Sequence, residues 1–164
     1  MRECIVTTLI LLSLPHGSAQ VVPAGWQAVK DSRNDAKNAC QIAVPPDWSL
    51  LGDNSGAAFF HDVSTAIAAV TSQPGQAFRP LTESLQKLLH ISRETLFENT
   101  AGRIFYRDRT SAHPEDPSSY SVSVPGKSGT CSAHVTFLPS VPEDVVRKIA
   151  LSLGPVPETR EGTF

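Results

Sequence analysis

Four histidines follow the first twenty residues of the chain, and they are the side chains best suited to bind a metal ion or move a proton: His61, His90, His113 and His134. None stands at His-x-x-x-His spacing, and no Cys-x-x-Cys pair occurs, so the sequence has no local metal-binding motif. His90 is expected to be solvated. His134 is expected to share a strand face with Ser132 and Thr136, opposite Cys131.

Two of these histidines lie beside acids, in His61-Asp62 and in His113-Pro114-Glu115. The residues predict one possible site, a metal-binding or hydrolytic centre assembled in three dimensions from His61, Asp62, His113 and Glu115. The simpler interpretation is that each is ordinary solvated surface, since neither segment has ligand spacing of its own.

Nucleophilic and nucleotide chemistry have little support in the sequence. Gly-x-Ser-x-Gly is absent, and the neighbours Ser111 and His113 do not by themselves make a triad. Neither Gly-x-Gly-x-x-Gly nor a P-loop occurs, so no cofactor is expected. Basic and aromatic side chains alternate in 103–107, but a net charge of −2 argues against nucleic acid. A charged edge strand is the better interpretation.

Trp26 and Trp48 lie near the ends of expected strands. Tryptophans in such places most often plug a small core and are only partly exposed. The alternative is that they form an aromatic platform for a ligand.

The amino terminus predicts export. An apolar run, 5–14, is followed by Gly17 and Ala19, small residues at the positions that a signal peptidase accepts. The run is too short to cross a membrane, and no other apolar segment of the chain approaches the length of a membrane-spanning helix. We therefore expect a signal peptide at 1–19, cleaved near Ala19, one domain at 20–154 and a flexible tail at 155–164. Cleavage leaves a periplasmic or secreted protein.

Two cysteines remain after this cleavage, Cys40 and Cys131. Each cysteine shares the inner face of an expected strand with apolar residues. An exported chain also meets an oxidising compartment. The sequence therefore predicts one disulfide bond between them, with two buried free thiols as the alternative.

Apolar alternation and turn residues predict about seven short strands. They are 25–30, 40–44, 57–61, 66–71, 103–107, 119–124 and 130–137, with loops at 49–56 and 108–118 and a turn at 72–75. Leucine periodicity predicts a helix from Pro80 or Thr82 to about Glu98. A second helix is expected after a capping box made by Ser140 and Glu143, and Gly154 and Pro155 stop it.

Seven strands with only two helices predict an α+β fold, a mainly antiparallel β-sheet with helices packed on it. Several segments of the chain match one known family: 40–48 (CQIAVPPDW), 65–70, the middle helix, 135–137, 143–145 and 149–153. Together they resemble the PsbP-like fold superfamily. That superfamily contains a photosystem II extrinsic protein, a Ran-binding nuclear import factor and many exported bacterial proteins.

The resemblance implies an α/β/α sandwich that binds other proteins and does not catalyse a reaction. The leading hypothesis is therefore a non-catalytic accessory or binding domain with a protein partner in the envelope or extracellular space. The alternative is the metal-binding protein or hydrolase described above.

Overall fold

The computed structural model describes residues 22–31, 39–54, 57–61, 66–109, 113 and 115–157. These residues form ten strands and two helices. The strands are β1 (Gln27–Lys30), β2 (Cys40–Val44), β3 (Ser49–Asn54), β4 (Ala57–His61), β5 (Ala66–Pro74), β6 (Leu96–Asn99), β7 (Ile104–Arg109), β8 (Ser118–Pro125), β9 (Gly129–Phe137) and β10 (Gly154–Pro155); the helices are α1 (Glu83–Leu88) and α2 (Glu143–Leu151). The predicted signal peptide lies outside the described residues.

The strands form two antiparallel sheets. The larger sheet has seven strands in the order β3-β4-β5-β9-β8-β7-β6, and the smaller one has three in the order β1-β2-β10. Each pairing between neighbouring strands is antiparallel. The fold is therefore α+β and mainly antiparallel β, as the count of strands and helices predicts.

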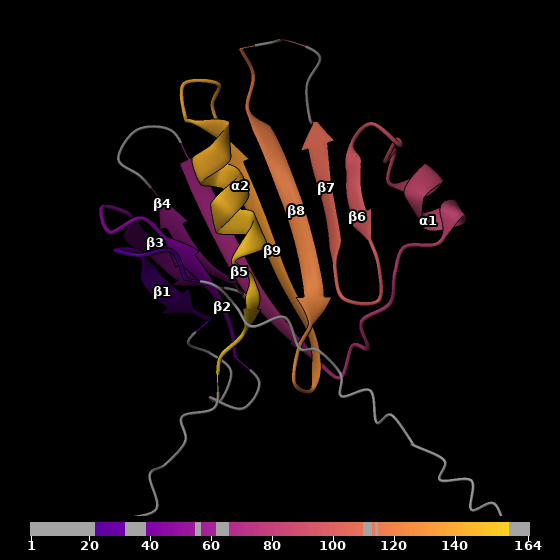
Figure 1. Ribbon diagram of the computed structural model, residues 1–164, viewed down its shortest axis with the longest axis horizontal. Coiled ribbons are helices and arrows are strands. Elements are labelled where there is room, and N and C mark those ends of the chain that lie inside the picture. Colours follow the sequence, from indigo (N-terminus) through magenta and orange to yellow (C-terminus); the bar gives the residue numbers. More distant parts are fainter. Residues whose placement is uncertain are drawn as a thin grey trace, which may run out of the picture.

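The core lies on one face of the seven-stranded sheet. Alternate residues of β5, β8 and β9 are buried on this face, as the strand period of two requires. They pack against β2, whose five residues are all buried, and against Val146, Ile149 and Ala150 of α2. Figure 1 shows α2 and the small sheet in front of this face. Leu153, just beyond the end of α2, is buried together with these three helix residues.

The predicted disulfide bond is present between Cys40 of β2 and Cys131 of β9, with their Cα atoms 5.5 Å apart. It joins the small sheet to the centre of the large one. Beside it, the Ser72 hydroxyl accepts a hydrogen bond from the Cys40 amide at 2.9 Å. The bond is typical of proteins in an oxidising compartment.

The long middle helix predicted at 80–98 is wrong. The helix α1 has only six residues and none of them is buried, and residues 96–99 form strand β6 instead. Of the leucines whose spacing predicted the helix, Leu85, Leu88 and Leu89 are exposed to solvent. The helix ends because His90 adopts a left-handed conformation with φ of 55°, from which an α-helix cannot continue.

Three further expectations differ from the structure. The segment 49–54, expected as loop, is the edge strand β3, and β5 continues through the expected turn to Pro74 because it pairs with β9 as far as Gly129. Gly154 and Pro155, expected to stop the helix and start a tail, form β10 against β2. The tail from 158 onward lies outside the described residues.

The predicted capping box at the start of α2 does not form. Pro142 occupies the N-cap position, and no side chain there accepts a hydrogen bond from the helix amides. The carboxylate of Glu143 bonds to Arg107 and Tyr120 of the sheet instead. Within the described residues neither helix has the length and apolar character needed to cross a membrane.

Candidate functional site

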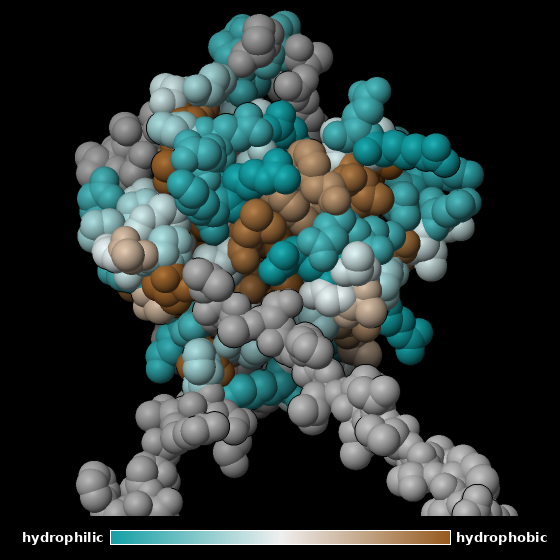
Figure 2. All heavy atoms as spheres, viewed as in Figure 1, coloured by the Kyte–Doolittle hydropathy of each residue, from teal (hydrophilic) through white to brown (hydrophobic). Residues whose placement is uncertain are grey.

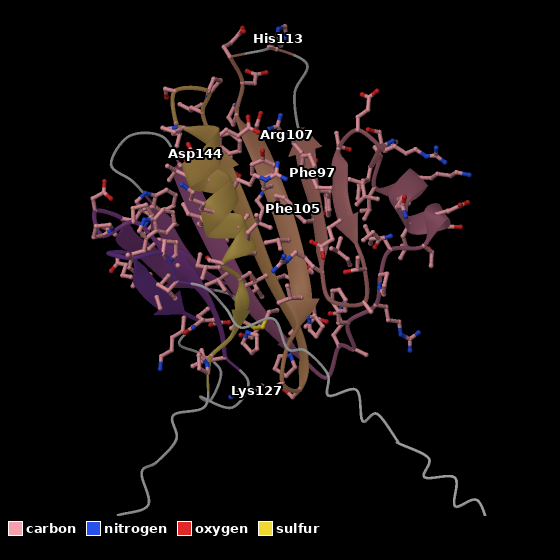
Figure 3. The ribbon with its side chains drawn as sticks, in the orientation of Figure 1. Phe97, Phe105, Arg107, His113, Lys127 and Asp144 are labelled. Carbon is pink, nitrogen blue, oxygen red and sulfur yellow. A yellow bond between two sulfur atoms is a disulfide. The ribbon has the colours of Figure 1, made fainter. Side chains whose placement is uncertain are left out.

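The structure describes three of the four residues of the hypothetical metal site. His61 ends β4, Asp62 lies outside the described residues, and His113 and Glu115 are exposed between β7 and β8, where Figure 3 labels His113. His61 lies at the same end of the large sheet as His113 and Glu115. Strand β9, however, lies between the β4–β5 hairpin and the β7–β8 hairpin. No group of three or more His, Cys, Asp or Glu side chains suited to a metal is present among the described residues.

The two tryptophans lie in or against the core. Trp48 is buried, and Trp26 is partly buried and packs against the core. The Gln27 side chain fixes the Trp48 segment by donating hydrogen bonds to the carbonyl oxygens of Pro45 at 3.1 Å and Trp48 at 2.8 Å. These positions match the core-plug interpretation.

The face of the large sheet opposite α2 contains a shallow cavity of about 240 Å³. It is lined by small side chains and two larger ones: Ala69, Thr71, Tyr106, Ser121, Val122, Ser123, Ser132, Ala133 and His134. Strand register explains the arrangement. Tyr106, Ser121 and His134 are cross-strand neighbours in one row, and Ser123, Ser132 and Thr71 form the adjacent row.

Hydroxyl groups in this cavity are within hydrogen-bond distance of one another and of the imidazole. The Ser121 Oγ is 2.9 Å from Nδ1 of His134, and the Ser123 Oγ is 3.0 Å from that of Ser132. A serine beside a histidine could act as a nucleophile with its base. The cavity lies in mid-sheet, however, where strand amides bond to neighbouring strands and are not free to stabilise an oxyanion. The arrangement suits binding better than acyl transfer.

A second polar cluster lies on the α2 side. Nη2 of Arg107 donates a hydrogen bond to the Tyr120 hydroxyl at 2.7 Å, and both groups bond to the same carboxylate oxygen of Glu143. Burial, and then the hydrogen bond to Glu143, raises the pKa of Tyr120 above its usual value. Burial alone would lower the pKa of Arg107, but its contacts with Tyr120 and Glu143 outweigh this and raise it.

Aromatic rings extend from this cluster towards the edge of the sheet. The ring centroid of Phe105 lies 5.2 Å from that of Tyr120 and 5.0 Å from that of Phe97. The guanidinium of Arg147 on α2 covers both phenylalanines, at 4.8 Å from Phe97 and 5.2 Å from Phe105. Figure 3 shows Phe97, Phe105 and Arg107 together beside α2. This cluster attaches α2 to β6 and β7, which is a structural role.

The helix α1 projects from the sheet edge beside β6 (Figure 1). Leu85 and Leu88 of α1 are 44% and 72% exposed, and Leu89 at its C-cap is 47% exposed. They follow the i, i+3, i+4 pattern that places side chains on one helix face. We call these three residues the leucine face. Figure 2 shows further apolar surface, in brown, between the hydrophilic surface of α2 and strands β6 and β7.

Hydrogen bonds fix α1 at both ends. At its start, the Leu81 amide donates to Asn99 Oδ1 at 2.8 Å and the Asn99 amide group donates back to the Leu81 carbonyl at 2.9 Å. At its end, the Ile91 amide donates to the Gln86 carbonyl at 2.9 Å and the His90 amide to that of Lys87 at 3.2 Å. This is the Schellman arrangement.

Sequence reasoning found some of these residues and missed others. The shared face of Ser132, His134 and Thr136 is confirmed by the alternating burial of β9. Tyr106 and Ser121 were missed as site residues, because only the register between distant strands places them beside His134. The leucines of the leucine face were recognised as part of a helical periodicity, but not as an exposed surface.

Comparison of the chain with protein-family models and with curated proteins finds no match.

Proposed function

We propose that this protein is an exported, non-catalytic binding domain that attaches to a protein partner through α1. The observation that supports the proposal most directly is the leucine face: three leucines at 44–72% exposure on a helix with no buried residue. Contiguous exposed apolar side chains of this kind mark interaction surfaces.

The way α1 is held supports the same conclusion. A six-residue helix is unstable in isolation, because nucleation costs more than so few hydrogen bonds return. Here the Leu81–Asn99 hydrogen bonds and the Schellman end hold it without burying its leucines. A helix fixed in advance loses little conformational freedom on binding. The pattern suits insertion into an apolar groove of the partner.

The partner is a protein, and two further features are consistent with this. The polar side of α1 has Glu83 and Lys87, one charge of each sign, and this is not the polybasic face that anionic membranes attract. The disulfide bond suits a protein working outside the cytoplasm. Export itself, through a signal peptide at 1–19, is part of the proposal.

We include in the proposal membership of the PsbP-like superfamily. The supporting features are the mainly antiparallel sheet and the carboxyl-terminal helix packed on it. A metal-binding or hydrolytic role for His61, Asp62, His113 and Glu115 remains the alternative. Native mass spectrometry of the purified protein with zinc, copper or calcium tests it, since retention of one ion per chain would support that role.

Site-specific photo-crosslinking tests the docking proposal. A photoreactive residue at position 88 in the producing cell is expected to give one discrete adduct with another protein. The matched control is position 50, because Leu50 is also exposed, at 58%, but lies on the opposite edge strand β3. Leu85→Ser is expected to abolish the adduct at position 88 and to change the free energy of unfolding by less than about 0.5 kcal/mol.

Two outcomes would contradict the proposal. Equal labelling at positions 88 and 50 would show that the leucine face has no special affinity. An adduct of twice the mass of the chain would show that α1 binds a second copy of this protein and not a different partner.

A further inference from the structure

The cavity on the face of the large sheet opposite α2 is separate from α1, which lies beside the edge strand β6. It is lined by four hydroxyl side chains, two alanines and a valine between Tyr106 and His134. No Lys, Arg, Asp or Glu side chain lines it. A ligand with a net charge would therefore find no opposite charge there, and a neutral polar ligand is favoured.

The shape of the cavity follows from residue size along one row of the sheet. Tyr106 on β7 and His134 on β9 flank Ser121 on β8. Neighbouring strands are about 5 Å apart, so the two larger side chains begin about 10 Å from each other with a short one between them. That interval accepts one saturated six-membered ring and its substituents.

The polar groups have the chemistry that hydroxylated ligands require. Each serine and threonine hydroxyl both donates and accepts a hydrogen bond, and its hydrogen can rotate to suit a partner. Ser121 with His134, and Ser123 with Ser132, already form hydrogen-bond pairs. Ligand hydroxyls can join such pairs without leaving a buried group unsatisfied. The Tyr106 ring offers an apolar surface together with a polar end.

We infer that this cavity binds a neutral saccharide, either a single sugar or the end residue of a glycan. The sugar ring lies against Tyr106, and its hydroxyls bond to Ser121, Ser123, Ser132 and His134. The cavity is smaller than the roughly 300–1,000 Å³ of sites for larger ligands, so one sugar residue is the unit recognised. A single sugar residue has about a dozen non-hydrogen atoms, and a ligand of this size in a shallow site is expected to bind with a Kd of about 1 mM.

Amide chemical shifts test this inference on the purified protein. The probes are the methyl glycosides of glucose, mannose and N-acetylglucosamine and their linear trimers. At least one is expected to give saturable shifts at the amides of residues 106, 121, 123, 132 and 134. Absence of saturation with every probe well above the expected Kd, or saturation confined to other residues, would overturn the inference.

Variants separate stacking from hydroxyl contacts. Tyr106→Ala is expected to raise the Kd about tenfold, while Tyr106→Phe keeps the ring and most of the affinity. Ser132→Val suits the strand but fills the cavity and removes a hydroxyl, so it also weakens binding. The spectrum of each variant reports whether it is folded. Unchanged affinity in folded Tyr106→Ala would overturn the inference.

A control distinguishes this site from the one on α1. Leu85→Ser is expected to leave the saccharide shifts unchanged, and Tyr106→Ala is expected to leave the crosslink at position 88 unchanged. Loss of saccharide binding in Leu85→Ser would place the sugar at α1 and refute the assignment to the sheet face.

Discussion

The hydroxyl of Tyr120 on β8 donates a hydrogen bond to the carboxylate of Glu143, the first residue of α2. Arg107 of β7 donates to both groups. A glutamate that was expected to close a local capping box therefore connects the helix to the sheet. The start of α2 is held by tertiary contacts, and its own N-cap contributes no side-chain hydrogen bond.

Two substitutions test whether the contacts of Glu143 with the sheet, and not a side-chain N-cap, stabilise the start of α2. Tyr120→Phe keeps the buried ring but removes the hydroxyl, and it is expected to lower the free energy of unfolding by about 1–2 kcal/mol. Ser140→Ala is expected to change it by less than about 0.5 kcal/mol, since Ser140 caps nothing. Urea unfolding measures both. A loss of about 1 kcal/mol or more in Ser140→Ala, the usual cost of a lost N-cap, would contradict this account.

The raised pKa of Tyr120 predicts a dependence on alkaline pH. The unfolded chain loses this proton near the usual pKa of about 10, before the folded protein does. Stability from this group is therefore complete below about pH 10 and decreases as pH rises towards the folded pKa. The difference in unfolding free energy between wild type and Tyr120→Phe is therefore expected to stay constant up to about pH 10 and to shrink at higher pH. A difference that stays the same above about pH 10 would argue against the prediction.

Much of the fold could be predicted because several strands alternate buried and exposed residues locally. β8 and β9 were predicted nearly to their ends for this reason. β2 was predicted from its apolar residues, although all five of its residues are buried. β3 was missed because Gly52, Asp53 and Asn54 are turn-forming residues, and only pairing with β4 makes the segment a strand. The helix α1 was predicted to be too long, because leucine periodicity indicates a shared helix face but not whether other residues cover that face.

The disulfide bond predicts a loss of stability on reduction. Its residues are 91 positions apart, and the loop-closure argument gives a contribution of about 2–4 kcal/mol, or slightly more. The Cys40→Ala/Cys131→Ala variant should unfold at a lower urea concentration by a corresponding amount. A reductant should destabilise wild type and leave this variant unchanged. Reactive Cys40 and Cys131 thiols in the unfolded, unreduced protein would show that the bond is absent.

The backbone of His90 predicts a stabilising substitution. A side chain at φ of 55° is strained, whereas glycine adopts this conformation freely. His90→Gly is expected to stabilise the end of α1 by about 0.5–1 kcal/mol and to slow hydrogen exchange of the Ile91 amide, which bonds to Gln86. His90→Ala keeps the strain and serves as the control. Faster exchange at Ile91 in the glycine variant would show that the strain is not relieved.

The candidate sites were less predictable than the fold, for a physical reason. The apolar alternation of β8 and the polar face of β9 are local patterns, and both were recognised. That Ser121 meets His134 depends on the register of two strands, which a one-residue shift would change completely. Exposure of Leu88 depends on what the rest of the chain does not cover, and no local pattern contains that information.

The large sheet ends on each side in a strand whose ladder is interrupted. β3 has a register shift between Leu50 and Gly52, and β6 has one between Leu96 and Glu98. A bulged edge offers an incoming strand a mismatched row of amides and carbonyls, which discourages end-to-end polymerisation. These two irregularities therefore protect both edges of the large sheet against pairing with the edges of other chains, which is the first step of fibril growth.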